Sequence, residues 1–320
     1  MKQIKKIAWG TSKLLEMHCE RFGSEEFAYC IDDFCERQNF MGLQVKPSHT
    51  LKDEKVASFQ ITIFAVSNHS LQAIFLKLNS FGLRYGNDFV LYSDFFYSAF
   101  VAQAEQSLGF QFNPNLYKHA VSSNMNSRVG VQTTMMGTWT LLELLNKLSP
   151  LQGAIAEVGA FECGNALICL NFLSHLPTKK YYIFDSFEGF AEVGPHDPKT
   201  SKKGDLKITN TFQEVLDSLK IFPEAIVIKG NVPHTFSEIP AAEKFALVFY
   251  DCDLYQPALD TFHYFWDKIV PGGYLVIHDH ETQKNGYTGV KKATDEFFAG
   301  MKVKKITFYQ NTMAVIKKEF

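Results

Sequence analysis

Short apolar segments with strand character alternate with helical segments along most of this 320-residue chain. After residue 150 the spacing predicts strands at 154–158, 181–184, 225–229, 245–250 and 274–278. Strands that alternate with helices pair in parallel, with helices on both faces of the sheet. Two further strands, 304–309 and 313–316, are separated by only residues 310–312 and are expected to form an antiparallel hairpin. The predicted fold class is therefore α/β, with a doubly wound sheet that ends in a hairpin.

The same alternation occurs near the start of the chain. Strands are predicted at 6–10, 27–31, 59–66 and 89–92, with helices at 12–22 and 71–81. This pattern predicts a small Rossmann-like domain over residues 1–95. Residues 96–140 are mixed and mostly helical, and we interpret them as a connector or lid. The larger α/β domain is expected at 141–320.

Composition narrows the function classes. The formal net charge is −2, which argues against a basic nucleic-acid groove. The longest apolar runs, such as 245–250, are far shorter than the ~20 residues of a membrane span. The basic start at 1–6 is followed by no apolar stretch, so no signal peptide is expected. The six cysteines show no zinc spacing, which favours reduced thiols in the cytoplasm.

A glycine-bearing turn follows the strand at 154–158. It contains Glu157, Gly159 and Gly164 in the pattern E-x-G-x4-G. Glycines let a ligand approach the backbone, and helix-terminal N–H groups favour polar or negative ligand atoms. Asp185, at the end of the next strand, stands where an acid can accept hydrogen bonds from ribose hydroxyls. An ordinary tight turn and a solvated strand-end acid are the alternatives.

Acidic and imidazole side chains follow two later strands. Asp251 and Asp253 come after the strand at 245–250, and the run 278–281 (HDHE) comes after the strand at 274–278. The carboxyl ends of strands in open α/β sheets share one crevice. Carboxylates suit hard cations such as magnesium, and imidazole shifts the preference toward manganese, iron or zinc. Taken alone, the run 278–281 is also compatible with a simple turn.

Five ordered blocks carry a resemblance to a known family. They are residues 156–164 (AEVGAFECG), 185–189 (DSFEG), 251–255 (DCDLY), 271–274 (PGGY) and the strand end at 278–279. In these blocks the chain resembles the macrocin O-methyltransferase family. The resemblance implies a class I methyltransferase fold with a seven-stranded sheet and S-adenosylmethionine as cofactor. It also implies a divalent metal, usually magnesium with manganese as the alternative, and a sugar hydroxyl as acceptor.

The resemblance assigns roles to single residues. Glu157 and Gly159 would line the methionine end of the cofactor, and Asp185 would hold its ribose. Asp251 and Asp279 would bind the metal. The remaining cofactor-binding residues would be Ala160, Gly164, Ser186, Gly230, Asn231 and Asp251. Relatives commonly carry two aspartates at positions 278 and 279, so the histidine here leaves the third metal ligand open between His278 and His280.

The predicted activity is a metal-dependent transfer of the methyl group to a hydroxyl of a sugar or glycosylated substrate, as in carbohydrate modification or polysaccharide biosynthesis. Asp251 is expected to be catalytic. His196, in the polar loop 194–198, is the candidate base, and a solvated loop histidine is the alternative. On this hypothesis His196→Ala lowers kcat greatly and leaves cofactor affinity unchanged. A saccharide substrate is expected, with no nucleic acid and no membrane span, and the resemblance favours a homo-oligomer.

Two other functions compete with this prediction. One is a non-catalytic binding module that keeps the methyltransferase fold, which His278 would favour. The other is a sugar-nucleotide enzyme that uses the N-terminal domain. Residues 10–13 (GTSK) keep only one glycine of a dinucleotide fingerprint, although Asp32 stands at the position of a ribose acid. We therefore favour a docking or sugar-nucleotide-sensing role for that domain.

Overall fold

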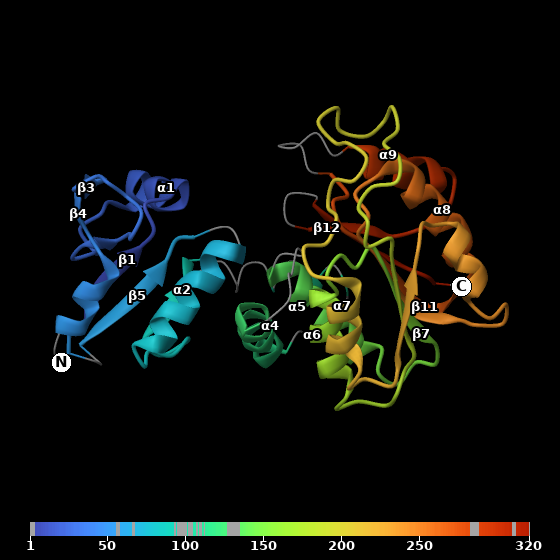
Figure 1. Ribbon diagram of the computed structural model, residues 1–320, viewed down its shortest axis with the longest axis horizontal. Coiled ribbons are helices and arrows are strands. Elements are labelled where there is room, and N and C mark those ends of the chain that lie inside the picture. The colour runs from blue at the N-terminus through green and yellow to red at the C-terminus, as the bar shows by residue number, and fades with distance from the viewer. Residues whose placement is uncertain are drawn as a thin grey trace. The chain divides into compact units, whose positions relative to one another are not determined.

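The computed structural model describes residues 4–55, 58–65, 68–92, 94, 101, 105–106, 108, 111, 113–126, 135–281, 288–308 and 312–319. The chain divides into two compact units, residues 1–109 and 110–320 (Figure 1). Much of the predicted connector at 96–140 lies outside the described residues. None of the helices in the described ranges has the length and apolar character that crossing a bilayer requires.

The first unit contains a six-stranded sheet in the order β3-β4-β2-β1-β5-β6. Its strands are β1 (Lys5–Trp9), β2 (Cys30–Ile31), β3 (Asn39–Phe40), β4 (Leu43–Lys46), β5 (Phe59–Ile63) and β6 (Phe89–Leu91). All pairs are parallel except β3 with β4. Over its described residues the helices are α1 (Lys13–Phe22) and α2 (Asn68–Ser80), with a 3₁₀ helix at Ser48–Asp53. The parallel strands follow a Rossmann-like order, as the sequence predicts.

The sequence does not predict β3 and β4. They form a hairpin through Met41 and Gly42, whose φ angles are 51° and 83°. Two positive φ values are what a two-residue hairpin turn requires. Methionine rarely adopts this conformation, so the sequence pattern gives no sign of the turn.

The second unit contains a seven-stranded sheet in the order β12-β13-β11-β10-β7-β8-β9. Its strands are β7 (Ala154–Val158), β8 (Tyr181–Asp185), β9 (Ala225–Lys229), β10 (Phe245–Tyr250), β11 (Ile269–Ile277), β12 (Lys305–Phe308) and β13 (Met313–Lys317). The strands from β7 to β11 pair in parallel, and β13 pairs antiparallel with both β11 and β12. The predicted seven-stranded sheet and its terminal hairpin are confirmed.

Helices cover both faces of this sheet (Figure 1). They are α4 (Pro114–Asn126), α5 (Met135–Lys147), α6 (Gly164–Leu173), α7 (Phe212–Leu219), α8 (Tyr255–Phe265) and α9 (Gly289–Phe297), with 3₁₀ helices at His234–Glu238 and Trp266–Lys268. Helices α4, α5 and α6 pack against one another, and α8 packs against α9. A core of aliphatic and aromatic side chains fills the space between the sheet and α8, where Phe262 and Phe265 are fully buried. This core holds the strand ends of the sheet in a fixed relation.

Candidate active site

One cavity of about 910 Å³ lies along the carboxyl ends of strands β7, β8, β10 and β11. Most of the cofactor residues predicted from the sequence line it, namely Glu157, Gly159, Ala160, Asp185, Ser186, Gly230, Asn231 and Asp251. Gly164, the first residue of α6, is not among the lining residues. The predicted metal ligands Asp251, His278 and Asp279 line the same cavity. The structure thus gathers residues more than 100 positions apart in the sequence around one space.

Gly159, in the turn after β7, packs closely against the backbone that follows β10. Its φ is +91°, and its N–H donates to the Phe184 carbonyl at 2.8 Å. A Cβ at this position would lie 2.3 Å from the Asp251 carbonyl oxygen and 2.8 Å from Cys252 Sγ. Only glycine therefore fits here without displacing the backbone that carries Asp251.

Glu157 and Asn165 form a buried polar end of the cavity. The Tyr181 hydroxyl donates to Glu157 Oε2 at 2.6 Å. Burial raises the pKa of Glu157 to about 8, and the hydrogen bond from Tyr181 opposes that rise only in part. Asn165 Oδ1 accepts from Thr138 Oγ1 at 3.2 Å. The Asn165 amide also lies beside Glu157 and favours its ionised form, although Nδ2 makes no hydrogen bond of normal geometry among the described residues. A ligand atom between Asn165 and Glu157 could therefore accept from Nδ2.

Asp185 is the last residue of β8 and supports the neighbouring loops. Its Oδ2 accepts from the Phe161 N–H at 2.8 Å, and its Oδ1 accepts from the Phe187 N–H at 2.6 Å. Burial raises the pKa of Asp185, although these backbone donors oppose the rise. Each carboxylate oxygen has further lone pairs, so the group can still accept from a ligand hydroxyl.

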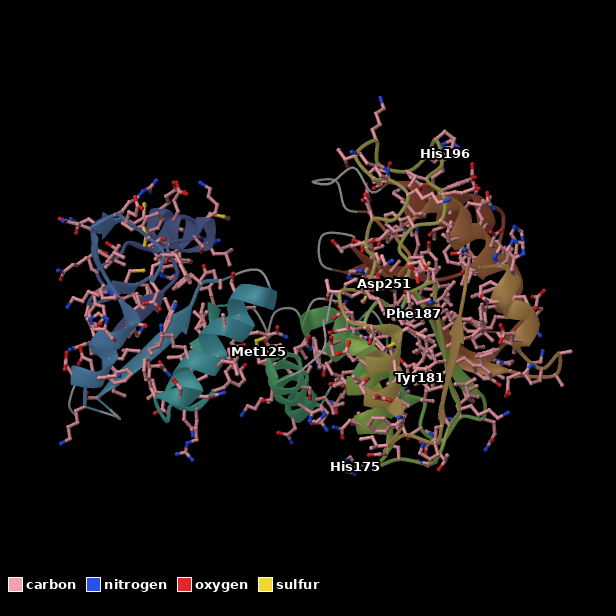
Figure 2. The ribbon with its side chains drawn as sticks, in the orientation of Figure 1. Met125, His175, Tyr181, Phe187, His196 and Asp251 are labelled. Carbon is pink, nitrogen blue, oxygen red and sulfur yellow. The ribbon has the colours of Figure 1, made fainter. Side chains whose placement is uncertain are left out.

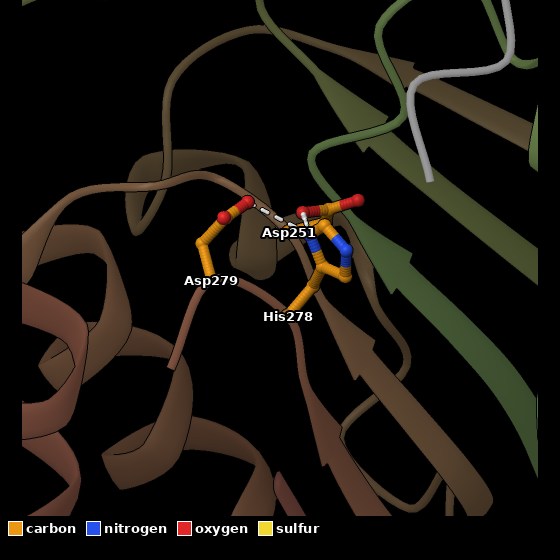
Figure 3. Close-up of side chains that lie close together, drawn as sticks. All are labelled: Asp251, His278 and Asp279. Carbon is orange, nitrogen blue, oxygen red and sulfur yellow. Dashed lines mark hydrogen bonds and ion pairs between the residues drawn. The ribbon is translucent and has the colours of Figure 1, made fainter. Parts of the chain in front are cut away.

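Asp251, His278 and Asp279 form a compact cluster (Figure 3). His278 Nδ1 lies 2.8 Å from Asp251 Oδ1 and 2.7 Å from Asp279 Oδ2. One ligand atom from each residue falls within 4.8 Å of the others. The His278 side chain is buried, and its Nε2 has no hydrogen-bond partner in the described parts of the chain. The cluster therefore brings three potential metal ligands to one point.

Sheet register explains why these residues meet. Tyr250 at the end of β10 lies opposite Ile277 at the end of β11, so the next residues, Asp251 and His278, leave the sheet side by side. The His278 N–H donates to the Tyr250 carbonyl at 2.9 Å, which extends this pairing by one residue. Burial lowers the pKa of His278, but the two neighbouring carboxylates outweigh it and hold that pKa well above its usual value.

The structure does not bring His280 into this cluster. Asp279 has a φ of 47°, so the chain turns away from the strand direction at that residue. The His280 N–H donates to the Thr312 carbonyl at 2.9 Å, and His280 Nε2 lies 3.4 Å from Lys305 Nζ on β12. Of the two histidines left open by the sequence, His278 faces the aspartates. The proposed ligand role of His280 has no support in this placement.

His196 also lies away from the cluster (Figure 2). Its side chain is exposed, and its ring centroid lies 4.6 Å from that of Tyr255. It lines a second, open cavity together with residues of α9, and it is not among the residues that line the cavity of Asp251. Its neighbour Asp197 fixes this loop, since its carboxylate accepts from the Tyr255 N–H and the Gly194 N–H, both at 2.7 Å. The geometry gives no support to His196 as the base.

In the first unit, Asp32 is used within its own loop. Its carboxylate accepts from the N–H and hydroxyl of Thr11, at 3.0 and 2.7 Å, and from the N–H groups of Phe34 and Cys35, at 2.9 and 3.1 Å. These four bonds occupy the lone pairs that a ribose would need. The placement argues against a dinucleotide site there.

A family model described as Macrocin-O-methyltransferase (TylF) matches residues 93–316. The chain belongs to the macrocin-O-methyltransferase family. It is therefore an O-methyltransferase, with S-adenosylmethionine as methyl donor. The matched residues include those that line the cavity and those of the cluster. The macrocin-O-methyltransferase region therefore covers most of the second unit and the last residues of the first.

Solved structures agree with this fold. The O-methyltransferase NovP aligns over 64% of this chain and 97% of its own, with a TM-score of 0.53 and 18% sequence identity. CalS11, a calicheamicin methyltransferase, aligns over 64% of this chain and 93% of its own, with a TM-score of 0.51 and 16% identity. No curated protein matches the chain in sequence. At these identities the comparisons show that this macrocin-O-methyltransferase family member shares its fold with both proteins.

Proposed function

We propose that the protein transfers the methyl group of S-adenosylmethionine to a hydroxyl of a saccharide and that it holds a divalent cation with Asp251, His278 and Asp279. The observation that carries this proposal is the position of the cluster in the wall of the cavity that contains Glu157 and Asp185. A methyl donor and a metal-oriented acceptor would thus share one space.

The residues of the cavity suit S-adenosylmethionine. Glu157 can accept from the ammonium group of the methionine end, and Asn165 Nδ2, which lines the cavity beside Glu157, can donate to the carboxylate of that same end. Asp185 can accept from the ribose hydroxyls, and Ser186, Gly230 and Asn231 line the space beside it. Asn165 is not predicted from the sequence, because a single asparagine after a glycine turn forms no recognisable pattern.

The cluster fits a divalent cation. Ligands at about 2.1 Å from a metal and at right angles to each other are about 3 Å apart. The 2.7 and 2.8 Å separations of His278 Nδ1 from the two carboxylates are close to that spacing. Two carboxylates also supply the negative charge that a dication needs. When bound, a divalent cation lowers the pKa of an acceptor hydroxyl and fixes its direction.

The protein's own groups would perform the remaining steps. The sulfonium of the donor makes its methyl group reactive, so the chain has to align the acceptor oxygen with it and exclude water. We assign Asp251 to this alignment, because it lines the cavity and belongs to the cluster. The proton acceptor is then sought among the cavity carboxylates rather than at His196.

Calorimetric titration tests this function. The full chain, stripped with a chelator, is titrated with S-adenosylhomocysteine and then with a divalent metal, in the wild type and in Asp251→Asn and Asp279→Asn. The proposal expects micromolar binding of the nucleoside and a separate metal heat that both variants lose. Nucleoside binding with no metal heat removes the metal from the proposal, and no nucleoside binding overturns the donor site. A screen of free and carrier-linked sugars then tests the acceptor class.

A further inference from the structure

The donor set of the cluster contains one nitrogen. His278 is 7% exposed, and its Nδ1 lies within hydrogen-bond distance of both Asp251 and Asp279. Its other nitrogen has no partner among the described residues. Nδ1 is thus the ring nitrogen that lies between the two carboxylates, at the position where a relative with a third aspartate would place an oxygen.

Metals differ in how well they accept such a set. Mg²⁺ is a hard cation that prefers oxygen ligands in near-ideal octahedral geometry and gives up its waters reluctantly. Imidazole nitrogen suits the first-row transition metals, whose affinity for mixed nitrogen and oxygen sites rises from Mn²⁺ toward Cu²⁺. Among the described residues no cysteine sulfur belongs to the cluster, so it offers no ligand that would favour soft metals such as Cu⁺.

We infer that this site binds a divalent first-row transition metal such as Mn²⁺ more tightly than Mg²⁺, and that the imidazole of His278 causes this preference. The inference rests on the metal site of the proposed function and narrows its metal class. It departs from magnesium, which the family resemblance implies. His280 does not add a second nitrogen to the cluster, because it contacts Lys305 and the Thr312 carbonyl instead.

The test compares Mn²⁺ and Mg²⁺ on the full chain after chelation. Dissociation constants come from calorimetry, in competition where needed, for the wild type, His278→Asp and His280→Asn. The wild type and His280→Asn are expected to bind Mn²⁺ more tightly than Mg²⁺ by about tenfold or more. His278→Asp, which makes the set all oxygen, is expected to bring the two metals within about threefold of each other.

Pulsed electron paramagnetic resonance gives a readout that is independent of activity. Mn²⁺ bound to the wild type is expected to show modulation from a directly coordinated imidazole nitrogen. This signal should be absent in His278→Asp and retained in His280→Asn. If His278→Asp does not fold, the nitrogen signal of the wild type and of His280→Asn still decides which residue binds.

The outcomes separate this inference from the function beneath it. Equal affinity for Mg²⁺ and Mn²⁺, or bound Mn²⁺ with no nitrogen modulation, overturns the inference and leaves a metal-dependent methyltransferase. Binding of S-adenosylhomocysteine with no binding of either dication means that the His278 imidazolium only neutralises the two aspartates. That result overturns both the inference and the metal part of the proposed function.

Discussion

Adding one methyl group at position 159 should damage the second unit and its site together. In Gly159→Ala the new Cβ would lie 2.3 Å from the Asp251 carbonyl oxygen, whereas ordinary contact begins near 3.4 Å. The backbone at Asp251 or at the turn must therefore move by about 1 Å. Overpacking of this kind typically costs about 1–3 kcal/mol. A left-handed φ on a residue with a Cβ costs a further 1–2 kcal/mol or so.

Gly204→Ala is the matched control in the same unit. Gly204 has a φ of +86°, close to the +91° of Gly159, but a Cβ there meets no atom within 4 Å. Gly204→Ala is therefore destabilised only by the left-handed φ and not by a steric clash. The two variants are thus expected to differ by about 1–3 kcal/mol in unfolding free energy, with Gly159→Ala the less stable.

Urea unfolding followed by tryptophan fluorescence measures the difference, since Trp139 and Trp266 report on the second unit and Trp9 on the first. A shift of the Asp251 backbone also moves its carboxylate relative to His278, now 2.8 Å away. S-adenosylhomocysteine and metal should therefore bind at least about tenfold more weakly to Gly159→Ala, which corresponds to about 1.4 kcal/mol. Equal stability of the two variants, together with wild-type ligand binding by Gly159→Ala, would refute this reasoning.

Three further predictions follow from the placement of single residues. Burial raises the pKa of Glu157 in the folded protein from 4.5 to about 8, so the stability that its protonated form contributes is complete below pH 4.5 and is lost as pH rises through 8, by up to about 5 kcal/mol. Urea unfolding at pH 5 and at pH 8.5 should therefore show a smaller loss of unfolding free energy in Glu157→Gln than in the wild type. An equal loss in the two proteins would contradict this prediction. His196→Ala should keep turnover within about threefold, contrary to the sequence-based hypothesis, and a loss of about 100-fold or more in steady-state kinetics would return proton transfer to His196. NADH should not bind to the first unit, because the Asp32 carboxylate is already fully hydrogen-bonded within its own loop. A saturable increase in NADH fluorescence when the protein is titrated would contradict this prediction.

The sequence by itself determined the order of the strands in the second unit and the edge of the sheet at which its polar residues lie. Strand and helix periods are local properties, so β7, β8, β10 and β11 can be found from short segments of the chain. A side chain that directly follows a strand must stand at its carboxyl end. For this reason Asp251 and the run 278–281 could be placed in one crevice from the sequence, whereas the roles of Glu157 and Asp185 came from the glycine turn and from the family resemblance.

Only the tertiary structure decided which histidine joins the aspartates. In an extended strand, residues 278 and 280 would point to the same side, so the sequence could not separate them. The positive φ of Asp279 ends that relation, leaving His278 against Asp251 and turning His280 toward Lys305. A single backbone angle that local composition does not reveal thus fixes which histidine lies against the two aspartates.

Long-range hydrogen bonds decided the remaining positions. Asp197 ties its loop to the start of α8, 58 residues later, and in this placement His196 lines the second cavity and not that of Asp251. Asp32 is occupied by Thr11, 21 residues earlier, and Asn165 is oriented by Thr138, 27 residues earlier. Partners so far apart are brought together by tertiary packing and not by local propensity, so short segments of the sequence do not reveal them.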